Sequence, residues 1–183
     1  MAMFRFAAAA ALLFALLPAH AAQDDPRLNE LFDALAKAPS AKMAAPIEQE
    51  IAKVWAESKS PTTDLLYLRG AAALESEDAD LALKLFETMT VLEPNFAEGW
   101  NMLANVHLMR DETTQAIVDV RRTLELEPRH YGALAALGQI MESLGDTKAA
   151  LAAYDASLKI NPNQDDVKQS AKTLRRKIDG DRI

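Results

Sequence analysis

Residues 97–130 read AEGWNMLANVHLMRDETTQAIVDVRRTLELEPRH, and residues 131–164 read YGALAALGQIMESLGDTKAALAAYDASLKINPNQ. Aligned one above the other, the two segments place small residues, large apolar residues and a proline at the same positions. A looser third copy precedes them, so that Pro94, Pro128 and Pro162 stand 34 residues apart. A fixed period of about 20 to 50 residues is typical of stacked repeat units. This period decides the fold class.

Two kinds of residue recur. Small residues stand 24 and 12 positions before each proline: Gly70, Ala104, Gly138, then Ala82, Ala116, Ala150. Larger apolar residues stand 28 and 8 positions before it: Leu66, Trp100, Leu134, then Phe86, Val120, Tyr154. Small residues let two helix backbones approach, and large ones fill the space between layers. The pattern predicts stacked helix pairs.

These positions resemble the motif of the tetratricopeptide repeat family. The second copy fits it best, with Trp100, Leu103, Ala104, Ala116 and Pro128 at the motif spacing. The copies depart from it where the motif prefers an aromatic residue, at Ala73, His107 and Met141. The resemblance implies an all-α, right-handed superhelical solenoid of antiparallel helix pairs, with repeats at 63–96, 97–130 and 131–164. It also implies protein binding rather than catalysis.

The first 21 residues are typical of a cleaved signal peptide. An apolar run from Ala7 to Leu17 is followed by Pro18 and by a small-residue cleavage site at Ala19–Ala21. The run spans about 16 Å as a helix, roughly half of a bilayer core, although an uncleaved interfacial anchor is the alternative. We expect a mature chain that begins at Ala22 and lies in a bacterial periplasm.

The remaining segments flank the repeats. We expect a flexible stretch at 22–27 and a degenerate helix pair at 28–60, which would cover the apolar flank of the first repeat. Residues 165–183 are predicted to form a capping helix and tail, whose basic end is alternatively a docking site. Asp78 and Asp146 are expected to cap the second helices of their pairs, with Asp111 or Thr113 in that role between them.

The sequence offers little for catalysis. It contains no cysteine, and only His107 and His130 remain once the leader is removed. His107 is expected to be a satisfied core histidine; a ligand role, or hydrolysis with a nearby acid, is the alternative. Arg129 and His130 are either structural or part of a recognition site. No metal-ligand spacing and no phosphate-binding loop is present, so no cofactor is expected.

Function is therefore expected on the concave surface, which in this family receives a partner segment. The exposed stripe of the first helices would supply the contacts, unless these residues are merely solvated. The candidate groove residues are Tyr67, Asn101, Met102, Asn105, Met109 and Gln139. Loss of the leader lowers the formal net charge from −7 to −8, which disfavours nucleic acid. The partner is expected to be a protein or peptide; the alternative is a structural subunit that docks through its terminal helices.

Overall fold

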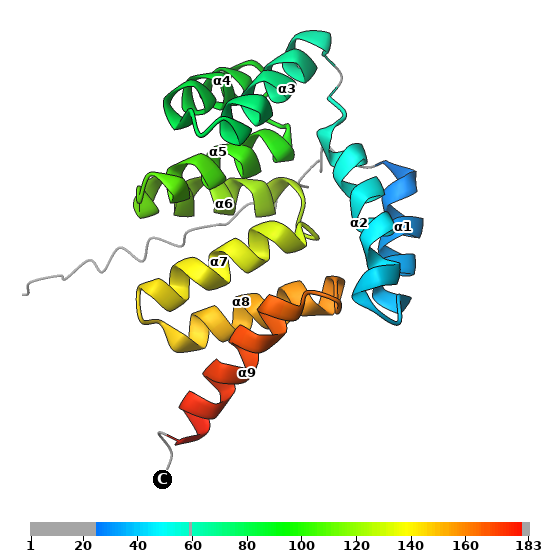
Figure 1. Ribbon diagram of the computed structural model, residues 1–183, viewed down its shortest axis with the longest axis vertical. Coiled ribbons are helices and arrows are strands. Elements are labelled where there is room, and N and C mark those ends of the chain that lie inside the picture. Colours follow the sequence, from blue (N-terminus) through cyan, green and yellow to red (C-terminus); the bar gives the residue numbers. More distant parts are fainter. Residues whose placement is uncertain (1–24, 59, 181–183) are drawn as a thin grey trace, which may run out of the picture.

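A computed structural model describes residues 25–58 and 60–180 (Figure 1). This part of the chain forms nine helices and no strand. The helices are α1 (Pro26–Lys37), α2 (Ala41–Ala56), α3 (Pro61–Glu75), α4 (Ala79–Leu92), α5 (Ala97–Met109), α6 (Thr113–Leu126), α7 (Tyr131–Ser143), α8 (Thr147–Ile160) and α9 (Asp165–Gly180). The expected leader lies outside the described residues. None of the helices described is both long and apolar enough to cross a bilayer.

Helices α3 to α8 form three antiparallel pairs that stack side by side, and α9 continues the stack on α8 (Figure 1). The all-α solenoid predicted from the 34-residue period is thus confirmed. Within each pair a short turn contains one residue with positive φ: Glu77, Asp111 or Gly145. Between pairs the connection is four residues long and contains the recurring proline.

The two helices of each pair touch where the sequence alternates small and large residues. A Cβ atom added to Gly138 would lie 2.4 Å from the ring of Tyr154, and one added to Gly70 would lie 2.5 Å from the ring of Phe86. In the middle pair the small residue is Ala104, and Val120 replaces the aromatic ring. The extra methyl group is therefore matched by a smaller partner, which keeps the space filled in all three pairs.

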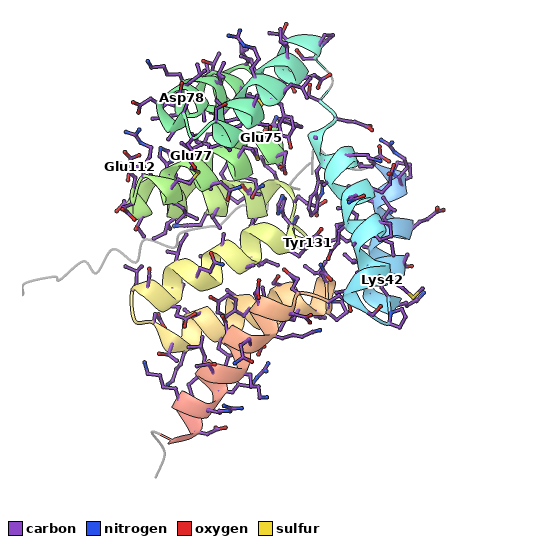
Figure 2. The ribbon with its side chains drawn as sticks, viewed as in Figure 1. Lys42, Glu75, Glu77, Asp78, Glu112 and Tyr131 are labelled. Carbon is purple, nitrogen blue, oxygen red and sulfur yellow. The ribbon has the colours of Figure 1, made fainter. Side chains whose placement is uncertain are left out.

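The turns inside the pairs only partly follow the prediction. Asp78 and Asp146 do cap their helices, because their carboxylates accept from the amides of Leu81 and Ala149 at 3.0 Å. The prediction for α6 is wrong, since its N-cap residue is Glu112 and no side chain caps it. The Glu112 carboxylate instead accepts from Nε of Arg110 at 2.9 Å. Asp78 and Glu112 lie at the same edge of the stack (Figure 2).

Helices α1 and α2 form a hairpin, which we call the N-terminal hairpin. Its core contains Leu28, Phe32, Ile51, Val54 and Trp55. We expected it to cover the free flank of α3, and that prediction is wrong. The hairpin runs across the ends of the repeat helices, at the edge where the pairs connect (Figure 1), and packs against α5 and α8. Tyr131 faces it there (Figure 2).

The free flank of α3 consequently stays exposed. Leu65 and Leu68 keep 56% and 65% of their surface in contact with solvent. The opposite end of the stack is different, because α9 buries Val167, Ala171 and Leu174 and turns a polar face outward. The two ends of the solenoid thus differ in character, the first apolar and the last charged.

The contact between Gly138 and Tyr154 gives a direct test of the packing. We expect Gly138→Ala to lower the free energy of unfolding by about 1–3 kcal/mol, because the added methyl group collides with a buried ring. Adding Tyr154→Val should restore part of the loss, since it recreates the Ala104–Val120 pair. Urea unfolding of the variants measures this.

Gly180→Ala is the matched control, because nothing lies within 4 Å of the atom it adds. Equal stability of Gly138→Ala and Gly180→Ala would contradict the packing described.

Candidate functional site

The candidate groove residues lie on the first helices of the pairs, on α3, α5 and α7. Tyr67, Asn101, Met102 and Asn105 are half-buried, whereas Met109 and Gln139 are exposed. Tyr67 and Met102 also pack against the core of the first pair, so part of their surface is structural. Their contact with a partner stays a prediction.

Asn101 is tied into a buried polar chain. Its Nδ2 donates to Oε1 of Glu98 at 3.2 Å, and Glu98 itself is buried in the first turn of α5. Burial raises the pKa of the Tyr67 hydroxyl to about 12, and the charge of Glu98 adds to the effect. Tyr67 and Asn101 therefore both lie close to one buried carboxylate, which fixes the orientation of the Asn101 amide.

Asn105 and Gln139 are different. They are 34 residues apart and occupy equivalent positions on α5 and α7. Neither side chain makes a hydrogen bond to another described residue. Each amide carries both donor and acceptor atoms. These two residues thus present unused hydrogen-bonding groups at the same level of two neighbouring helices.

The exposed stripe on the first helices contains no Lys or Arg. Its remaining members are small, apolar or acidic: Ala71, Leu74, Leu108, Ala135 and Glu142. Glu142 accepts a hydrogen bond from the hydroxyl of Tyr154 at 2.9 Å. A groove that recognises a carboxylate needs Lys or Arg at such positions. The arrangement instead suits a segment recognised through its backbone.

His130 joins the repeats to the N-terminal hairpin. Its Nδ1 accepts from the backbone amide of Ala133 at 3.0 Å, so it is the N-cap of α7. Nε2 then carries the ring proton and donates to Oε2 of Glu98 at 3.1 Å. The indole of Trp55 stacks on the imidazole at 4.0 Å with an interplanar angle of 9°. Of the two roles that the sequence left open for His130, structural or recognition, these contacts support the structural one.

Arg129 has a similar role. Its guanidinium donates to Oδ1 of Asn29 at 2.7 Å and lies 4.5 Å from the centre of the Phe32 ring, both on α1. It also pairs with the buried Glu127, on the same turn. Nothing in a single sequence shows that a turn at 127–130 meets a helix 100 residues away, so sequence reasoning missed this interface.

His107 is the other residue considered for chemistry. It is buried, and its Nδ1 lies 2.6 Å from Oδ2 of Asp119, which is buried too. Burial raises the pKa of the Asp119 carboxyl, while the hydrogen bond from His107 opposes that shift. The expectation of a satisfied core histidine is confirmed. The described residues contain no cluster of His, Asp or Glu suited to a metal ion.

Comparison with known proteins agrees with the repeat pattern. The model of the tetratricopeptide repeat matches residues 131–164. A TPR repeat-containing protein of Rhizobium etli is 30% identical over 156 residues, which are 85% of this chain and 76% of that protein. The chain belongs to the tetratricopeptide repeat family. The matched range coincides with the third of the three repeats expected from the sequence.

Solved structures of tetratricopeptide repeat proteins share the fold. The first TPR of Spaghetti, bound to an HSP90 peptide, superposes with a TM-score of 0.62 at 15% identity, covering 66% of this chain and 95% of its own. MamA superposes with a TM-score of 0.59 at 22% identity, covering 85% of this chain and 83% of its own. At these identities the likeness concerns the fold alone.

The role of His130 in this tetratricopeptide repeat protein is testable. We expect His130→Ala to lower the free energy of unfolding by about 0.5–2 kcal/mol through the lost cap, and further because Glu98 loses a buried partner. His130→Asn should cost less, since asparagine is itself a good N-cap. Chemical unfolding gives the two values.

Near-ultraviolet circular dichroism reports the Trp55 stacking in the same samples. If His130→Ala unfolds at the wild-type denaturant concentration and keeps the aromatic signal, the structural role assigned to this side chain is wrong.

Proposed function

We propose that this protein is a non-catalytic adaptor of the bacterial cell envelope that holds an extended segment of another protein in its concave groove. The observation that carries the proposal is the pair Asn105 and Gln139, which occupy equivalent positions of α5 and α7 and whose amides form no hydrogen bond with another described residue. Spaced amides can donate to and accept from a peptide backbone without reading its side chains.

The charge of the candidate groove indicates what charge a bound segment would carry. The stripe contains Glu142 and no Lys or Arg, and the chain as a whole is acidic. An acidic surface disfavours segments rich in carboxylates and favours neutral or basic ones. The solved TPR of Spaghetti has an HSP90 peptide bound, which supports peptide binding as the kind of activity. We propose a neutral or basic segment for this chain.

A periplasmic location is part of the proposal. It is supported by the apolar run, the break at Pro18 and the small residues Ala19 and Ala21, which together match an export signal. The absence of cysteine is compatible with that compartment, since the helical core needs no disulfide.

A second candidate function rests on the free flank of α3. Leu65 and Leu68 are exposed there because the N-terminal hairpin packs elsewhere. Exposed apolar residues at the end of a stack are typical of a docking surface. In this alternative the protein is a structural subunit that joins a larger complex through its first repeat.

One binding experiment separates the two candidates. The partner is captured by crosslinking in the native envelope, and its affinity is measured for purified variants. We expect Asn105→Ala with Gln139→Ala to weaken binding about five- to 150-fold, because each of the two lost hydrogen bonds is worth about 0.5–1.5 kcal/mol. Gln115→Ala, an exposed amide on α6, is the matched control.

In the same assay Leu65→Ser with Leu68→Ser tests the flank of α3. If this variant loses the partner and the groove variant keeps it, the protein docks through its end and the groove proposal fails.

Export is tested independently. We expect the protein extracted from its native cell to begin at Ala22, because the small residues at 19 and 21 flank the predicted cleavage point. Amino-terminal sequencing gives the answer. An intact Met1, or recovery of the protein in the cytoplasmic fraction, would contradict a periplasmic location.

A further inference from the structure

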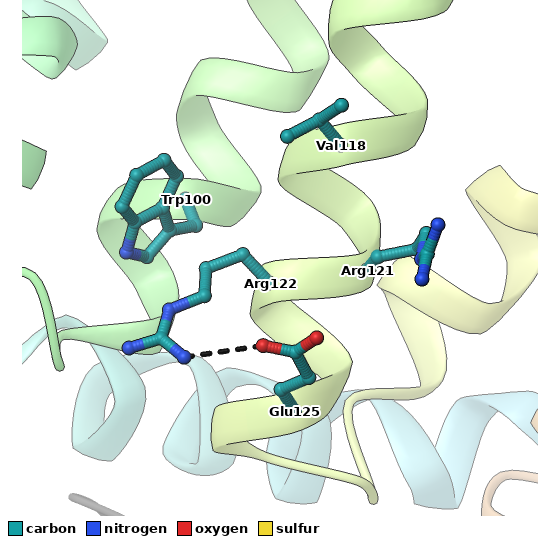
Figure 3. A pocket seen from close by; sticks show the side chains of 5 residues that line it. All are labelled: Trp100, Val118, Arg121, Arg122 and Glu125. Carbon is teal, nitrogen blue, oxygen red and sulfur yellow. Dashed lines mark hydrogen bonds and ion pairs between the residues drawn. The ribbon is translucent and has the colours of Figure 1, made fainter. Parts of the chain in front are cut away.

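A surface pocket lies away from the candidate groove residues. It has a volume of about 260 Å³ and lies between α5 and α6, beside the turn that joins α4 to α5 (Figure 3). Its lining consists of Trp100, Val118, Arg121, Arg122 and Glu125. None of the candidate groove residues takes part. We call it the Trp100 pocket.

Most of the polar atoms in this pocket are already used. Nε1 of Trp100 donates to the carbonyl of Pro94 at 3.0 Å. Arg122 donates to the same carbonyl at 3.2 Å, to Oδ1 of Asn95 at 3.1 Å and to Oε2 of Glu125 at 3.1 Å. Only the apolar ring of the indole is therefore available to contact a ligand. Arg122 is held in place as a wall of the pocket, with Glu125 beside it (Figure 3).

The other two side chains that line the pocket, Val118 and Arg121, are exposed to solvent. Val118 keeps 60% of its surface exposed, so the pocket has a second apolar side. Arg121 is exposed and makes no hydrogen bond or ion pair with any other residue of the described ranges. A guanidinium presents a planar fork of donors that matches a carboxylate. The pocket thus combines the apolar surface of Trp100 and Val118 with Arg121, which extends from the side of α6 away from Trp100 (Figure 3).

We propose that the Trp100 pocket binds an acidic side chain of a partner protein that is flanked by an aliphatic residue. The carboxylate would pair with Arg121, and the aliphatic group would pack on Trp100 and Val118. Charge complementarity selects this occupant, because a single carboxylate gains from Arg121 while a polyanion is repelled by a chain of net charge −7. The site goes beyond the proposed groove, which lacks a base and favours the opposite charge.

Two capped tripeptide amides test the proposal, Leu-Asp-Leu and its neutral isostere Leu-Asn-Leu. The indole N–H signals of the 15N-labelled full chain report binding, because the protein has two tryptophans. Trp100 lies in the pocket, and Trp55, stacked on His130, serves as the internal reference. We expect the acidic peptide to shift Trp100 alone and to bind about three- to fivefold more tightly than the neutral one, the size of an exposed ion pair.

Arg121→Gln should remove that preference and leave the weak apolar binding of both peptides. Arg176→Gln removes an exposed arginine on α9 that forms no ion pair with another described residue; it changes the net charge equally and should keep the preference. The proposal is overturned if the wild type binds both peptides equally, if the two arginine variants behave alike, or if Trp55 shifts together with Trp100. Failure here leaves the groove experiment unaffected, because the two sites share no residue.

Discussion

The structure depends on the close approach of two helices within each pair. A glycine or alanine on the first helix meets a buried side chain on the second, and the sizes of the two are matched: glycine with Phe86 or Tyr154, alanine with Val120. Interiors are packed as densely as organic crystals, so a mismatch of one methyl group is felt. Asn105 and Gln139 lie on the first helices of neighbouring pairs, and those helices share a core cluster that contains Ala104, Ala133 and Ile140. The relative positions of these two candidate groove residues therefore depend on how the core packs.

A buried polar chain connects the groove to the N-terminal hairpin. It runs from Asn101 to Glu98, on to His130 and then to the stacked ring of Trp55. Buried polar groups are costly unless each has a partner, so a satisfied chain of this kind specifies one arrangement. The hairpin therefore does more than cover apolar surface, since the orientation of Asn101 depends on it through two intervening side chains.

Much of this architecture could be predicted from the sequence, for identifiable reasons. The 34-residue period placed Gly138 at the contact between paired helices and His107 in the core, because such positions are fixed within one repeat and its neighbour. It did not pair Gly138 with Tyr154, whose ring was expected between layers. Positions that depend on distant segments could not be placed. The turn containing Arg129 meets Asn29, which is 100 residues away, and no local pattern encodes that contact. The same limit explains why the flank of α3 was expected to be covered.

The hairpin also changes how the chain behaves as a folding unit. Repeat solenoids are nearly one-dimensional, with each unit touching only its neighbours, so their stability is close to a sum of local terms. Here Nδ2 of Asn163 donates to the carbonyl of Ala38 at 2.9 Å, and Glu48 and Asn161 are hydrogen-bonded, across separations of 125 and 113 residues. Such contacts raise the contact order and close a loop around all three repeats. The array is thereby made into a single cooperative domain, in which the first helices cannot come loose without the last repeat also losing contacts.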